Sequence, residues 1–159
     1  MYLCVITPLK AGNLECLGFR FCGDDRLYMK TTFSYKFFNS TNTAWQAMYQ
    51  AVLGSYKSIY WEVYIFIDDE SGNRFVDLLC EKAQQGVDVK IIIDAVGSFG
   101  FSQLAINRLK NSGAEIIIFS PLSINEKSLK KWWTRVWLRT HCKVLIVDER
   151  SAFLGGVNV

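Results

Sequence analysis

Three consecutive isoleucines, Ile91, Ile92 and Ile93, form the centre of an apolar segment, residues 87–94, that limits the folds open to this chain. Successive side chains of a strand point to opposite faces of its sheet, so a strand of this composition buries both faces. Strands of this kind are typical of parallel sheets covered by helices, because a sheet with one face in water alternates apolar and polar residues. The segment therefore predicts an α/β fold.

The neighbouring segments alternate between strand and helix patterns. Residues 58–67 are rich in Ile, Val, Tyr and Trp, which predicts a strand. Asp69 is placed to cap the helix that follows, and Gly86 to end it. A helix over residues 102–111 and a strand over residues 115–119 come after the isoleucine segment. This order predicts a βαβαβ unit with right-handed connections, in a mixed, largely parallel sheet flanked by helices.

The composition of the chain changes near residue 38. Residues 1–37 are rich in glycine, cysteine and aromatics without helical period, and fit either short strands or a partly ordered extension. We treat residues 1–38 as an N-terminal extension of unclear role. From Asn39 several capping residues precede a helical pattern that reaches about Tyr56. Residues 39–159 are expected to form one domain, because a chain of 159 residues buries one sizeable core.

Charge, hydropathy and cysteine content restrict the class of protein. The 18 Lys and Arg against 15 Asp and Glu give a net charge of +3, which is too small to indicate an acidic partner. No apolar run approaches the length of a membrane span, and the N-terminus lacks the cationic start of a signal peptide. Five cysteines without a CxxC pair fit a reducing compartment. We therefore expect an unexported chain that does not span the bilayer.

The strongest chemical signal lies near the C-terminus, where residues 141–158 follow the pattern HxKxxxxDxxxxxxGGxN. Two residues apart on a strand, a histidine and a lysine point to the same face, where both can meet one phosphate. The aspartate follows an apolar run and begins a turn, after which the chain can return as a paired strand. Each position alone has an ordinary structural explanation, whereas all six at this spacing favour a site. The six residues are His141, Lys143, Asp148, Gly155, Gly156 and Asn158.

This spacing is the signature of the phospholipase D superfamily, and the chain resembles the N-terminal half of a bacterial cardiolipin synthase. Segments 64–72, 86–89 and 94–98 are also similar to stretches of cardiolipin synthases, so the resemblance covers residues 39–159. Cardiolipin synthases often have arginine where this chain has Cys142. The family builds its site from two copies of the motif. The resemblance therefore implies a domain truncated after its motif, completed by a deleted C-terminal half or by a second protomer.

The resemblance also implies a reaction, phosphatidyl transfer from a phosphatidylglycerol-type phospholipid through a phosphohistidine. His141 would be the nucleophile, and Lys143, Gly156 and Asn158 would bind the substrate phosphate. Asp148 would support the site, either by orienting a histidine or by holding the turn. A cation and amide donors can stabilise the phosphate charge, so no metal or cofactor is implied.

Partners and alternative functions depend on a basic, tryptophan-rich segment at residues 127–139. This segment fits a lipid-facing surface, an amphipathic helix packed against a second catalytic half, or a contact with nucleic acid. We expect an anionic phospholipid rather than nucleic acid as partner, and a cytoplasmic chain peripheral to the inner face of the cell membrane. The alternatives are a phosphodiesterase or nuclease, and a catalytically incomplete binding fragment. The residues concerned are Lys127, Lys130, Lys131, Trp132, Trp133, Arg135, Trp137 and Arg139.

Overall fold

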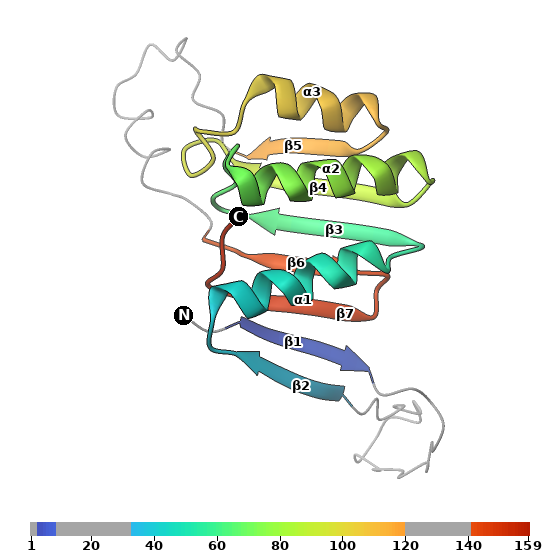
Figure 1. The fold of residues 1–159 in the computed structure, drawn as a ribbon, viewed down its shortest axis with the longest axis vertical. Coiled ribbons are helices and arrows are strands. Elements are labelled where there is room, and N and C mark those ends of the chain that lie inside the picture. Colours follow the sequence, from blue (N-terminus) through green and yellow to red (C-terminus); the bar gives the residue numbers. More distant parts are fainter. Residues whose placement is uncertain (1–2, 9–32, 120–140) are drawn as a thin grey trace, which may run out of the picture.

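A computed structural model of the chain describes residues 3–8, 33–119 and 141–159. These residues form a seven-stranded sheet with strand order β2-β1-β7-β6-β3-β4-β5, and three helices that pack on it (Figure 1). The strands are β1 Leu3–Pro8, β2 Phe33–Phe38, β3 Ser58–Val63, β4 Asp88–Asp94, β5 Glu115–Phe119, β6 Val144–Val147 and β7 Ser151–Gly155. The helices are α1 Thr41–Leu53, α2 Glu70–Gln84 and α3 Gln103–Asn111.

The sheet is mixed, as predicted, but its parallel part is smaller than expected. Strands β3, β4 and β5 are parallel and are joined by α2 and α3, which confirms the βαβαβ unit. The other four pairings between described strands are antiparallel. They arise because β6 and β7 form a hairpin and because β1 and β2 extend the sheet beside β7. Part of the N-terminal segment, whose role the sequence leaves unassigned, thus belongs to the same sheet.

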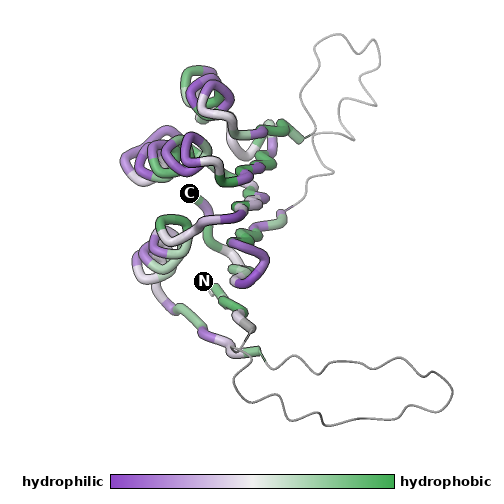
Figure 2. The backbone as a smooth tube through the Cα atoms, turned by 90° about the vertical axis from the view of Figure 1, so that its right-hand side faces the viewer, coloured by the Kyte–Doolittle hydropathy of each residue, from purple (hydrophilic) through white to green (hydrophobic). Residues whose placement is uncertain are grey.

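The described helices cover only one face of the sheet. Figure 2, at right angles to Figure 1, shows α1, α2 and α3 on one side of the strands. In β4, Val89, Ile91 and Ile93 are buried, whereas Asp88 and Lys90 are exposed. The prediction that this segment buries both faces is therefore wrong for its first half, where the residues alternate as in a strand with one face in water. No helix of the described ranges is long and apolar enough to cross a membrane.

Local signals place α2 as the sequence predicts. The Asp69 carboxylate caps the helix by accepting a hydrogen bond of 2.8 Å from the Gly72 backbone N–H. A Cβ at Gly72 would lie 1.8 Å from the backbone oxygen of Ile67, so only glycine fits this turn. Gly86, with φ of 89°, ends the turn after the helix and starts the chain toward β4. The connection from β3 to α2 is thereby held tightly against the end of β3.

The predicted strand over residues 58–67 ends earlier than expected, at Val63. Beyond it the chain pairs with the C-terminal residues instead of with a sheet neighbour. The Ile67 N–H donates to the Val159 carbonyl at 3.0 Å, and the Val159 N–H donates to the Ile65 carbonyl at 3.1 Å. The arrowhead of β3 accordingly ends beside the C-terminus in Figure 1. This pairing brings the last residues of the motif to the carboxyl end of β3.

Candidate active site

Strand register places four of the motif residues at one edge of the sheet. Strand β6 runs antiparallel to β3, with Val144 opposite Glu62 near the end of β3. His141 and Lys143, which precede β6, therefore lie beside the carboxyl end of β3. The Gly155 N–H donates to the Lys143 carbonyl at 3.3 Å, which places the glycine pair at the same edge. Asn158 joins them through the bond described next.

Asn158 is fixed from two sides. Its backbone carbonyl accepts a 2.8 Å hydrogen bond from the indole N–H of Trp45 in α1. Its side-chain Oδ1 accepts a 3.3 Å hydrogen bond from the Ile65 N–H. The Nδ2 group donates to no atom of the described residues, so the orientation leaves amide donors for a ligand.

His141 and Lys143 share an aromatic neighbour, Tyr64, the residue directly after β3. The His141 and Tyr64 rings are stacked, with centroids 4.2 Å apart and planes inclined by 24°. The Lys143 ammonium lies 5.3 Å from the centre of the same ring and also donates to the His141 carbonyl at 3.1 Å. An exposed imidazole thus forms one cluster with a half-buried ammonium and a half-buried aromatic ring. Such a cluster favours an anionic ligand, because Lys143 is a cation and the imidazole carries an N–H donor.

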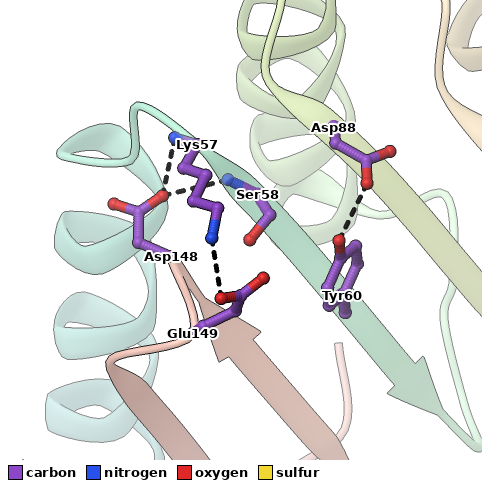
Figure 3. Close-up of polar contacts among 6 residues, drawn as sticks. All are labelled: Lys57, Ser58, Tyr60, Asp88, Asp148 and Glu149. Carbon is purple, nitrogen blue, oxygen red and sulfur yellow. Dashed lines mark hydrogen bonds and ion pairs between the residues drawn. The ribbon is translucent and has the colours of Figure 1, made fainter.

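Asp148 lies at the other end of β6. It is five positions beyond Lys143 along extended chain, roughly 16 Å at the rise of a strand. Asp148 is buried and accepts backbone hydrogen bonds at the start of β3 from Lys57 at 2.8 Å and Ser58 at 3.0 Å (Figure 3). It also accepts one from the Tyr56 N–H at 3.2 Å. It does not contact His141. Of the two roles left open by the sequence, this geometry favours holding the turn.

The groups with displaced pKa values also lie away from His141. The hydrogen bond with Glu149, at 2.7 Å, raises the pKa of Lys57 above its usual value. The hydrogen bond from the Tyr60 hydroxyl, at 2.8 Å, lowers the pKa of Asp88 and raises that of Tyr60 (Figure 3). Both contacts are exposed and lie near the amino ends of β3 and β4. A further pKa, that of Arg108 in α3, is raised by its hydrogen bond to Asp77. These contacts are ordinary surface interactions and do not indicate a second reactive site.

Comparison with known families decides the classification. Residues 46–159 match the family described as "Cardiolipin synthase, PLD-like domain", which is more than half of the chain. The chain belongs to this PLD-like family. The matched region includes all six motif residues as well as Tyr64 and α2.

Individual relatives of this PLD-like domain carry related names. The chain is 36% identical over 118 residues to a cardiolipin synthase of Clostridium perfringens, covering 74% of this chain and 24% of the relative. It is 35% identical to the probable cardiolipin synthase YwiE of Bacillus subtilis, covering 70% of this chain and 21% of the relative. The chain thus spans about a fifth to a quarter of these relatives. The solved phospholipase D family member Nuc of Salmonella typhimurium is 23% identical, with a TM-score of 0.45, over 68% of this chain and 72% of that one.

One residue that contacts the candidate site was missed by the sequence interpretation, and one segment lies outside the described residues. Tyr64 stood in a segment noted only for its resemblance to cardiolipin synthases, and the placement of β6 beside β3 brings its ring to His141. A tyrosine at the end of a strand whose neighbours are unknown gives no separate signal. The basic, tryptophan-rich segment 127–139 lies outside the described residues. Within the described residues no group of three His, Cys, Asp or Glu side chains could hold a metal ion.

Proposed function

We propose that this chain supplies one half of a phospholipase D-type active site that transfers a phosphatidyl group, as in a cardiolipin synthase. The observation that carries the proposal is that His141, Lys143 and Asn158 all lie at the carboxyl end of β3, where an imidazole, an ammonium and an amide could surround one phosphate. The cardiolipin synthases among the relatives support a phosphatidylglycerol-type phospholipid as substrate. Gly156 lies at the same edge and lets backbone approach the phosphate.

In the proposed reaction, a ring nitrogen of His141 attacks the phosphorus of the phosphodiester. A P–N bond forms, the P–O bond to the leaving glycerol breaks, and the leaving oxygen takes a proton. In the second step an acceptor hydroxyl attacks the phosphorus and loses its proton, the P–N bond breaks, and the histidine is restored. Lys143 and Asn158 stabilise the nonbridging oxygens in both steps, where charge develops.

The leaving oxygen requires an acid other than His141, because a histidine that acts as nucleophile cannot donate a proton at the same moment. His141 is the only histidine among the 159 residues. We therefore assign the acid to a second catalytic half, contributed either by another copy of this chain or by another polypeptide segment. Contact with an anionic membrane through residues 127–139, at the inner face of the cell membrane, is part of the same proposal.

A substrate whose leaving group needs no proton allows one half of the site to be tested alone. Bis(p-nitrophenyl) phosphate releases nitrophenolate, which is a stable anion near neutral pH. The purified chain should release one nitrophenolate and gain a nitrophenyl phosphate group on His141, detected by intact mass and peptide mapping at alkaline pH, where phosphohistidine persists. The absence of both the burst and the adduct from folded chain would overturn the proposal.

The acceptor distinguishes transferase from hydrolase. On vesicles of phosphatidylglycerol, a transferase forms cardiolipin and glycerol, whereas a phosphodiesterase that uses water forms phosphatidic acid and glycerol. The second function is kept because the PLD-like motif performs the same first step in both. Lipid products are separated by chromatography after incubation of the chain with the vesicles. Predominance of phosphatidic acid would favour the hydrolase over the transferase.

Chelators are expected to leave the nitrophenolate burst unchanged within about twofold, because Lys143 and Asn158 are assigned the charge stabilisation that metals provide elsewhere. The measurement is the burst rate before and after dialysis against EDTA. Loss of the burst with recovery on addition of one divalent cation would contradict this assignment.

If a second copy supplies the acid, the rate on phosphatidylglycerol should rise faster than linearly with the concentration of the chain. The nitrophenolate burst per chain should be independent of that concentration, since nitrophenolate leaves without a proton from an acid. Both quantities are measured over a series of chain concentrations, and sedimentation velocity on the same samples gives the oligomeric state. A monomeric chain that forms cardiolipin at a specific rate independent of concentration would contradict the requirement for a second histidine.

A further inference from the structure

Tyr64 contacts both His141 and Lys143 of the candidate site and has no place in the proposed reaction. Its ring lies against the imidazole of His141, with centroids 4.2 Å apart, and within 5.3 Å of the Lys143 ammonium. Both partners lie on the segment that leads into β6, whereas Tyr64 follows β3. The ring therefore joins the end of β3 to residues 141–143, which have no regular secondary structure.

One side of Tyr64 is held by the loop after β4. The Ser98 hydroxyl donates to the Tyr64 carbonyl at 3.1 Å and accepts from the Phe66 N–H at 3.0 Å. A Cβ on Gly97 would lie 2.2 Å from the same Tyr64 carbonyl, so the loop can approach this closely only with glycine there. The Asp94 carboxylate in turn accepts 2.9 Å bonds from the Val96 and Gly97 N–H groups, which fixes the loop.

The other side is held by the end of the motif. The Ile65 N–H donates to Asn158 Oδ1, and the Ile65 carbonyl accepts from the Val159 N–H. The backbone at Tyr64 therefore lies between two supports, the loop with Gly97 and Ser98 and the segment with Asn158. A group held by hydrogen bonds on both sides can restrict the side chains that rest on it.

We infer that Tyr64 is a positioning residue for His141 and Lys143, and that the Gly97–Ser98 turn acts through it. The inference rests on the proposed function. Stacking limits rotation of the imidazole and so fixes the direction in which its ring nitrogens point. The electron-rich face also stabilises positive charge, both on Lys143 and on the imidazole ring that becomes cationic when the P–N bond forms. Loss of the face should therefore slow bond formation more than it weakens substrate binding.

The placement of the ring can be measured without activity, because the chain contains a single histidine and its ring proton signals belong to one residue. In the wild-type chain these protons should show an upfield ring-current shift and nuclear Overhauser contacts to the Tyr64 ring. Tyr64→Leu should abolish the upfield shift, and Tyr64→Phe should retain it. Ser98→Ala, which removes the two hydrogen bonds beside Tyr64, should reduce it. A folded wild-type chain without the contacts would overturn the inference.

Kinetics of the nitrophenolate burst give the second readout. We expect Tyr64→Leu to lower the first-order rate of adduct formation about tenfold, with the half-saturating substrate concentration changed by less than about twofold. Tyr64→Phe, which keeps the aromatic face, should remain within about threefold of wild type. Tyr60→Leu is the matched control, since Tyr60 lies earlier on β3 and bonds Asp88 instead of the motif. It should leave the rate unchanged.

The outcomes separate this inference from the proposed function. If His141→Asn retains the adduct, the proposed function fails whatever the spectra show. If the adduct depends on His141 but Tyr64→Leu reacts at the wild-type rate, the positioning role fails and the proposed function stands. If Tyr64→Leu does not fold, the positioning role is tested by the Overhauser contacts of the wild-type chain and by the rate of adduct formation in Ser98→Ala. An unchanged ring-current shift and an unchanged rate in Ser98→Ala contradict the role assigned to the Gly97–Ser98 turn.

Discussion

Replacing His141 with asparagine should lower the rate of adduct formation from bis(p-nitrophenyl) phosphate by at least about 10³-fold. Asparagine retains a polar side chain of smaller size but has no nitrogen able to attack phosphorus. No other histidine in the chain can substitute for it. The measurements are the nitrophenolate burst and the intact mass of the protein, with circular dichroism to show that the variant is folded.

Cys142 provides the control for this prediction. It is an exposed free thiol next to His141, and a thiolate is the other side chain here that could attack an activated phosphodiester. Cys142→Ala should form the adduct at the wild-type rate. An adduct mapped to Cys142, or one that persists in His141→Asn, would show that His141 is not the nucleophile. The pair of variants therefore tests the identity of the nucleophile and not merely the presence of reactivity.

Features governed by neighbouring residues could be predicted from the sequence. The cap at Asp69, the turn at Gly86 and the return of the chain after Asp148 depend on residues within a few positions of one another, and all three are present. The βαβαβ unit was predicted for a similar reason, because a short crossover helix leaves one right-handed way to place the next parallel strand. His141 and Lys143 lie at the same ring, but they precede β6, so the strand periodicity on which their prediction rested does not explain this position.

Features that depend on distant pairing could not be predicted. Nothing in the sequence indicates that β6 pairs with β3 and that β1 pairs with β7, yet these pairings reduce the parallel part of the sheet. The same pairings make Tyr64 a neighbour of His141, 77 positions away in the sequence. Asp148 shows the converse. It lies near His141 in the motif, but a strand between them carries it to the opposite end of the sheet.

The second large effect concerns Asp148, and it is on stability. Asp148→Ala should lower the free energy of unfolding by about 3 kcal/mol, since a buried carboxylate that accepts three backbone hydrogen bonds is lost and the Ser58 N–H is left buried without it. Asp148→Asn should cost less, because an amide oxygen can still accept the bonds from Lys57 and Ser58. Urea unfolding followed by circular dichroism gives the free energies.

A variant of the adjacent residue, Glu149, distinguishes the contribution of the Asp148 hydrogen bonds to stability from that of backbone strain in the turn. Asp148 and Glu149 both have positive φ, 54° and 55°, so replacing either with alanine keeps a side chain in a conformation that alanine tolerates poorly. Glu149 is exposed and makes only an ion pair with Lys57, which water screens. Glu149→Ala should therefore be much less destabilising, and the difference between the two alanine variants measures the contribution of the buried carboxylate to the free energy of unfolding.

At low temperature, where Asp148→Ala remains folded, its adduct with bis(p-nitrophenyl) phosphate should form at the wild-type rate per folded molecule. A stable Asp148→Ala chain that forms no adduct would show instead that the carboxylate acts on the reaction across the length of β6.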